Sequence, residues 1–113
     1  MIMFWLGRRF ALAVAAVLLL VGAGLAAAAE HAAVTIGDFA FKQGTITVKR
    51  GTTVTWTNKD DEPHTVVSEA DPKLWKSPPL DTDDSFSFTF NEAGTFKYFC
   101  SVHPRMRGTV VVE

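Results

Sequence analysis

Hydrophobic and polar residues alternate one by one along much of the chain. The alternation is most regular in S-F-S-F-T-F (85–90) and T-F-K-Y-F-C (95–100), and shorter stretches of the same kind lie at 34–41, 46–50, 53–57, 64–68 and 109–112. These stretches are rich in β-branched and aromatic residues, and Gly, Asn or Asp residues separate them at short intervals. Because a period of two between such turns is typical of strands, we expect an all-β, antiparallel Greek-key β-sandwich.

One long connection interrupts this pattern between Glu69 and Asp84. It contains three prolines, which argue against a buried central strand in this stretch. Trp75 and Leu74 are the residues of the connection that could fold back over one end of the core. Core packing is the ordinary role of such an aromatic side chain, and it is the role that we expect for Trp75.

The first 29 residues differ in composition from the rest. Arg8 and Arg9 precede a long apolar run, which ends in A-A-A-A just before Glu30. This order of a basic start, an apolar middle and small residues predicts a secretory signal peptide at 1–29, cut after Ala29. The alternative is an uncleaved anchor, since about twenty apolar residues can span a bilayer. We therefore expect export to the periplasm, a domain at 30–113, and membrane contact only if the signal segment stays attached.

Charge and cysteine content narrow the possible functions further. Without residues 1–29 the net charge is −3, and no basic cluster is present, which argues against a nucleic-acid partner. A domain this small gains little stability from its core alone, and the single cysteine, Cys100, cannot form an internal disulfide. A bound metal ion is another source of stability for such a domain.

The lone cysteine opens the motif C-S-V-H-P-R-M at 100–106. Cys100, His103 and Met106 are spaced three residues apart, and the alternation that precedes Cys100 directs its side chain into the sandwich. A fourth donor, His64, follows a proline at the start of another predicted strand. If the two strands finish at the same end of the sandwich, all four side chains meet there.

Donor chemistry favours copper for this set. A thiolate, two imidazoles and a thioether form a soft, mixed group, and a His₂Cys set with a weak axial Met is typical of type 1 (blue) copper sites. Zinc takes thiolate and imidazole, but a thioether is not among its usual ligands. Taken singly, a buried cysteine is usually inert and a methionine usually fills the core. Cysteine-protease chemistry is disfavoured, because no third group is available to orient the histidine.

Four segments resemble the cupredoxins, and among them the amicyanins and amicyanin-like plastocyanin-family proteins. They are V-T-W-T-N (54–58), P-H-T-V (63–66), E-A-G-T-F-K-Y-F-C (92–100) and C-S-V-H-P-R-M-R-G-T-V-V-V-E (100–113). The resemblance spans the whole predicted domain, and the short Cys-x-x-His-x-x-Met spacing is its most specific part. It implies a single copper ion with His64, Cys100 and His103 as equatorial ligands and Met106 as the axial one.

The resemblance also implies roles for residues around the ligands. The Thr65 N–H would donate to the Cys100 sulfur, and Asn58 would brace the ligand loop by hydrogen bonds near Ser101. Such outer contacts orient metal ligands and tune the metal. An ordinary turn role for Asn58, at the start of N-K-D-D, is compatible with this one.

By the same resemblance, the protein is expected to be a monomeric periplasmic one-electron carrier and not an enzyme. Its partners would be redox proteins, such as a c-type cytochrome or a periplasmic dehydrogenase or oxidase. The residues expected to face a partner are Glu62, Pro63, Pro104, Arg105 and Arg107. A copper carrier and a metal-free β-sandwich interaction module remain as alternatives.

Two of these residues depart from the amicyanin pattern. Arg105 stands where amicyanins have an aromatic residue, and Glu62 stands where they have an apolar one. The departures put docking to a methylamine dehydrogenase in doubt. We expect Arg105 and Arg107 instead to orient a partner with an acidic rim, mainly through the association rate.

Overall fold

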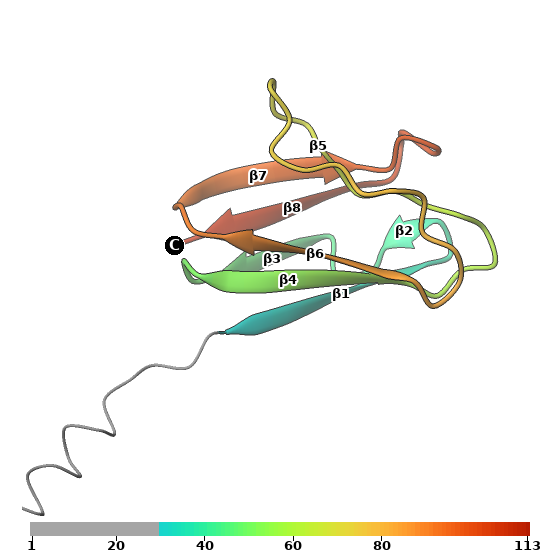
Figure 1. The fold of residues 1–113 in the computed structure, drawn as a ribbon, viewed down its shortest axis with the longest axis horizontal. Coiled ribbons are helices and arrows are strands. Elements are labelled where there is room, and N and C mark those ends of the chain that lie inside the picture. Colours follow the sequence, from blue (N-terminus) through green and yellow to red (C-terminus); the bar gives the residue numbers. More distant parts are fainter. Residues whose placement is uncertain (1–29) are drawn as a thin grey trace, which may run out of the picture.

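The computed structural model describes residues 30–113. This part of the chain forms eight strands joined by turns and loops, and it contains no helix. The strands form two four-stranded sheets packed face to face (Figure 1). They are β1 (His31–Gly37), β2 (Ala40–Phe41), β3 (Thr45–Val48), β4 (Thr52–Asn58), β5 (Val67–Ser68), β6 (Ser85–Phe90), β7 (Gly94–Phe99) and β8 (Arg107–Val112). The predicted all-β sandwich is confirmed, whereas the predicted signal peptide at 1–29 lies outside the described residues. Over 30–113, no helix is long and apolar enough to cross a membrane.

The predicted antiparallel pairing holds for four of the six pairs of neighbouring strands in residues 30–113, and the other two pairs are parallel. One sheet has the order β2-β1-β4-β6 and the other β3-β8-β7-β5. β1 pairs with β4 in parallel, and so does β3 with β8, while the other neighbours are antiparallel. The chain passes through the second sheet as β3 before it returns as β4. For this reason β4 runs beside β1 in the same direction.

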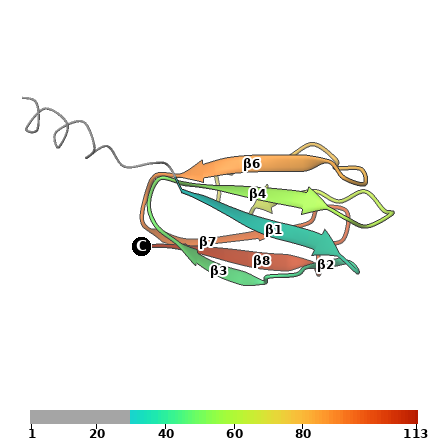
Figure 2. The ribbon, with the colours of Figure 1, turned by 90° about the horizontal axis from the view of Figure 1, so that it is seen from below.

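Three strands finish at the same end of the sandwich. In Figure 2 the arrows of β1, β4 and β7 all point to this end, which we call the loop end. The segments that follow them are the β1–β2 turn at 38–39, the loop at 59–66 and the loop at 100–106. The predicted metal ligands lie in the last two of these segments.

The alternation along β4 matches its two faces. Val54 and Trp56 are fully buried between the sheets. The threonines at 53, 55 and 57 alternate with them and face outward, where Thr55 Oγ1 lies 2.7 Å from Ser87 Oγ of β6 and similar hydroxyl pairs flank it. Such cross-strand pairs hold the register of β4 and β6 on the solvent side while the apolar face forms the core.

Aromatic side chains fill the centre of the core. The Trp56 ring packs edge-on against Tyr98 of β7, with 5.3 Å between the ring centroids. Trp75, from the long connection, stacks on Trp56 at 6.0 Å and is itself buried. This is the packing role expected for Trp75, whereas Leu74 remains 49% exposed and does not fold back.

The strand predicted at 64–68 is shorter in the structure and covers only β5 at 67–68. His64 forms a single bridge to Leu80 through two backbone hydrogen bonds. The next two N–H groups bond side chains, since Thr65 N donates to Cys100 Sγ and Val66 N donates to Ser77 Oγ. Because these donors are taken by side chains, no ladder can form before residue 67.

Close packing around Tyr98 depends on Gly108 in the neighbouring strand β8. A Cβ atom at position 108 would lie 2.3 Å from the Tyr98 hydroxyl, far inside van der Waals contact. We expect Gly108→Ala to lower the free energy of unfolding by about 1–3 kcal/mol, the usual cost of overpacking a core. Urea unfolding measures this loss. Gly37→Ala is the matched control, because its new Cβ would meet only the end of the flexible Lys42 side chain. Equal stabilities of the two variants would contradict the prediction.

Candidate metal centre

Three side chains with metal-binding atoms meet at the loop end. Cys100 follows β7 directly, His103 lies in the same loop, and His64 lies in the loop after β4. Cys100 Sγ lies 3.8 Å from His64 Nδ1 and 3.9 Å from His103 Nδ1, and the two nitrogens are 3.2 Å apart. Two loops far apart in sequence thus bring together three of the four predicted ligands.

These separations fit a single metal ion. Nitrogen and sulfur ligands lie about 2.0–2.3 Å from a first-row ion, so two donors on opposite sides of it would be about 4.3 Å apart. The three separations between these atoms are all shorter than this limit. One ion between the atoms can therefore reach all three. Two imidazoles and a thiolate are donors that suit copper, so the residues present fit the predicted metal.

The buried His64 ring is fixed by a carboxylate on its far side. His64 Nε2 lies 2.8 Å from Asp60 Oδ2. The hydrogen bond from the Phe39 N–H is the main cause that lowers the pKa of Asp60 below its usual value, and the His64 ring lowers it further. Burial of Asp60 acts in the opposite direction but does not outweigh them. An ionised Asp60 favours the tautomer in which Nε2 carries the hydrogen and donates it. The lone pair of Nδ1 then faces Cys100 and His103, as a metal ligand requires.

The Cys100 thiol is prepared for metal binding by its neighbours. Burial raises its pKa, but the Thr65 N–H and the rings of His64 and His103 outweigh burial and lower the pKa to about 6. The Thr65 nitrogen lies 3.4 Å from the Cys100 sulfur, which is the contact that the family resemblance implies. Because the thiolate is the form that binds metals, Cys100 offers it already at neutral pH.

Thr65 also joins the two ligand loops to each other. Its hydroxyl oxygen lies 2.7 Å from Ser101 Oγ and accepts the Ser101 N–H at 2.7 Å. Among residues 30–113, Asn58 hydrogen-bonds groups other than Ser101. The Asn58 side chain donates to the carbonyl oxygens of Glu62 and Leu80 and accepts the N–H of residue 60. It therefore braces the loop that carries His64, and its side chain forms no hydrogen bond to the loop at 100–106.

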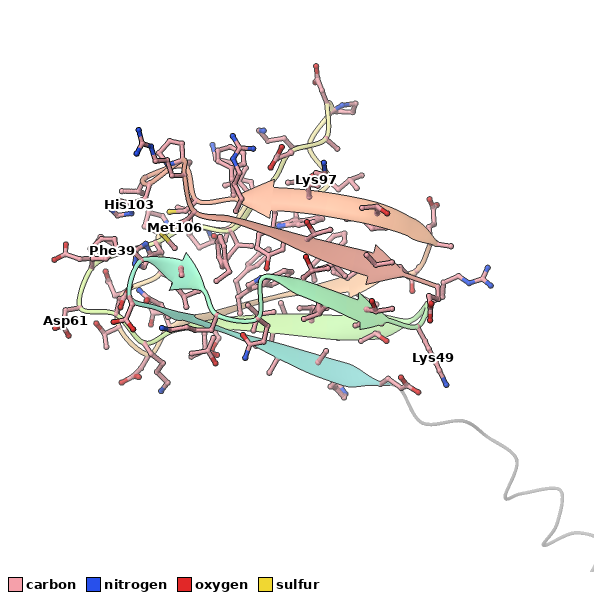
Figure 3. The ribbon with its side chains drawn as sticks, turned by 180° about the vertical axis from the view of Figure 1, so that it is seen from behind. Phe39, Lys49, Asp61, Lys97, His103 and Met106 are labelled. Atoms are coloured by element: carbon pink, nitrogen blue, oxygen red, sulfur yellow. The ribbon has the colours of Figure 1, made fainter. Side chains whose placement is uncertain are left out.

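Met106 is the last residue of the loop at 100–106, and it is buried. Its N–H donates to the His103 carbonyl at 2.9 Å, and its own carbonyl accepts the Cys100 N–H at 3.0 Å. The side chain is buried, and Figure 3 shows it beside His103. The backbone of the loop thus holds Met106 close to two of the donors, and its role as axial ligand stays a prediction.

The five residues expected to face a partner are all exposed: Glu62, Pro63, Pro104, Arg105 and Arg107. The two arginines differ, however, in their surroundings. Arg107 Nη1 lies 3.0 Å from Glu69 Oε2, so its charge is partly balanced within the molecule. Over residues 30–113, Arg105 has no ion-pair partner.

Two residues of this region were not identified from the sequence. One is Asp60, the carboxylate behind His64, for which a spacing of four residues before the histidine was the only signal. The other is Phe39, whose ring lies edge-on against both His64 and His103. The sequence pattern did not indicate a role for Phe39 at this site. Alternation placed Phe39 in a predicted strand, whereas it lies in a turn that is distant in sequence from both histidines.

The sequence of this chain is similar to one protein family and to several characterised proteins. A family model described as a cupredoxin-like domain matches residues 10–112. Amicyanin-alpha of Methylorubrum extorquens is 39% identical over 83 residues, a match covering 71% of this chain and 70% of that protein. Amicyanin of Paracoccus denitrificans is 42% identical over 86 residues, covering 71% of this chain and 63% of the relative. The second match thus leaves more than a third of that relative unmatched.

Solved structures show the same likeness in three dimensions. A purple cupredoxin from Nitrosopumilus maritimus has a TM-score of 0.67 and 37% identity, over 73% of this chain and 99% of that one. A variant of amicyanin solved in its Cu(I) form has a TM-score of 0.69 and 40% identity, over 80% of this chain and 88% of that one. These values extend the similarity from the sequence motifs to the arrangement of the strands.

Proposed function

The chain belongs to the cupredoxin-like family, and from this premise we propose that it is a type 1 copper protein that carries single electrons between redox proteins in the periplasm. The observation that carries the proposal is the group of two imidazole nitrogens and one thiol sulfur, 3.2–3.9 Å apart, on loops with the cupredoxin spacing. The amicyanins that this chain resembles are electron-transfer proteins and not enzymes.

Four residues would hold the copper ion. His64, Cys100 and His103 would supply two imidazole nitrogens and a thiolate, and Met106 would supply a weakly bound thioether. When bound, copper would supply a one-electron couple between Cu(I) and Cu(II). The protein contributes ligands whose positions are fixed by packing and hydrogen bonds, such as those that Thr65 makes to both loops. Fixed ligands keep the rearrangement between the two oxidation states small.

The surface around His103 supports docking of a protein partner. His103 is partly exposed and lies between the exposed side chains of Phe39, Val102 and Pro104 in one shallow depression. An apolar contact there would bring a partner's redox centre close to a ligand of the metal. Arg105, at the rim of the same depression, would favour a partner with an acidic edge and act mainly on the association rate. The partner would be a redox protein, such as a c-type cytochrome or a periplasmic dehydrogenase or oxidase.

Copper titration of the apo-protein tests the proposed function. We expect uptake of one copper ion per chain and an intense visible absorption from thiolate-to-Cu(II) charge transfer, with the small copper hyperfine splitting of a type 1 site in the EPR spectrum. Addition of a reductant should bleach the colour reversibly. Weak, tetragonal Cu(II) absorption, or no stoichiometric uptake, would rule the proposal out.

A further inference from the structure

The β1–β2 turn has an unusual backbone for its sequence. Ile36–Gly37 pair with Ala40–Phe41, so Asp38 and Phe39 form a two-residue turn. Both turn residues have positive φ values, 51° for Asp38 and 55° for Phe39. Hairpin turns of this kind strongly favour Asn-Gly, and a bulky residue with positive φ is an outlier. A local rule is therefore broken at Phe39, and such breaks are common at functional sites.

A single carboxylate holds this turn in place. Asp60 Oδ1 accepts the N–H of Asp38 at 2.7 Å, and Asp60 Oδ2 accepts the N–H of Phe39 at 2.9 Å. The same Oδ2 atom lies 2.8 Å from His64 Nε2. The strained turn and the buried histidine thus share one anchor, which offsets the unfavourable backbone of Phe39 and sets its position relative to His64.

The Phe39 ring is placed against both histidines of the metal centre. Its centroid lies 5.4 Å from that of His64 and 5.0 Å from that of His103, with interplanar angles of 90° and 87°. Both geometries are favourable edge-to-face contacts. The side chain is nevertheless 51% exposed, so burial of apolar surface gives little reason for a phenylalanine here. Figure 3 shows Phe39 and His103 together at the loop end.

We propose that Phe39 is a positioning residue, held in a strained turn so that its ring fixes the orientation of both imidazoles. This inference rests on the proposed copper function but concerns contacts that exist without the metal. The ring limits rotation of the partly exposed His103, whose other ring contacts, to His64 and Cys100, lie on the side of the metal-binding atoms. A fixed His103 ring keeps the donor geometry the same in the two oxidation states.

Two substitutions at position 39 separate this role from a structural one. Phe39→Gly removes the ring and suits a positive φ, whereas Phe39→Tyr keeps an aromatic ring in place. We expect the apo-protein with Phe39→Gly to melt at the same temperature as the wild type or higher. In the same apo-protein, NMR signals of the His103 ring should broaden or split as the ring becomes mobile. Phe39→Tyr should keep the wild-type ring signals, and Leu74→Ala controls for the loss of an exposed apolar side chain elsewhere.

The copper-loaded variants supply the second measurement. With Phe39→Gly we expect a changed visible and EPR spectrum and a slower electron self-exchange, by about tenfold, since small displacements of reacting groups are costly. Unchanged histidine ring signals in the apo-protein and an unchanged copper spectrum would overturn the inference. A lower melting temperature of the apo-protein would also overturn it, because Phe39 would then be kept for stability. If the wild type itself gives no type 1 spectrum, the proposed function fails, and the apo-protein signals still decide the role of Phe39.

Discussion

Replacing Cys100 by serine is expected to abolish the intense visible absorption of the copper-loaded protein. The absorption requires a sulfur-to-copper charge transfer, and Cys100 is the only cysteine of the chain. A buried serine hydroxyl keeps nearly the same volume, but it does not ionise near neutral pH as the Cys100 thiol does with its pKa of about 6. The variant therefore loses both the soft donor and its negative charge. Copper that remains bound to the two histidines should give only weak absorption.

The fold of this variant can be checked without copper. Cys100 makes no disulfide, and the Thr65 N–H that points at its sulfur can donate to a serine oxygen after a small shift. The apo-protein should therefore still unfold cooperatively, which separates loss of the site from loss of the fold. A copper-loaded Cys100→Ser protein that keeps the wild-type colour would contradict the proposed site.

Local patterns were sufficient to predict most strands and the contents of the second ligand loop. Strand alternation depends on neighbouring residues, and Phe96, Tyr98 and Cys100 show it without interruption. Likewise, three donors within residues 100–106 can meet through a single short loop, so their convergence needs no contact between distant segments. The position of His64 beside them was expected only on the condition that two strands end together, and the structure satisfies that condition.

Local sequence patterns could not predict the features that depend on contacts between residues distant in sequence. The parallel pairing of β1 with β4 follows from the path of the chain through the other sheet, which no local pattern records. The short β5 results from N–H groups that bond Cys100 Sγ and Ser77 Oγ, residues distant in sequence. Phe39 was missed for the same reason, since its contact with the histidines depends on a hydrogen bond from the β1–β2 turn to Asp60. Single tertiary contacts decide these details, and they leave no periodic signal.

Asp60→Ala is expected to weaken copper binding by about 10- to 100-fold, the usual effect of losing a group that orients a metal-ligating histidine. The carboxylate fixes the Nε2–H tautomer of His64 and also anchors the turn that carries Phe39. Without it, His64 can rotate or place its hydrogen on Nδ1, and either change must be reversed before copper binds. Competition with a chelator of known copper affinity measures the loss.

Removal of any negative charge near a cation weakens binding, so the prediction needs a control of equal charge. Asp61→Ala provides it, because the neighbouring Asp61 is exposed and, among residues 30–113, its side chain hydrogen-bonds no residue of the metal centre. Asp60→Asn keeps the shape but cannot satisfy all three donors, so it should lie between the wild type and Asp60→Ala. If Asp60→Ala and Asp61→Ala lose the same affinity, Asp60 acts only through its charge. A larger loss for Asp60→Ala would instead mean that hydrogen bonds from one carboxylate hold the His64 ring ready for the metal.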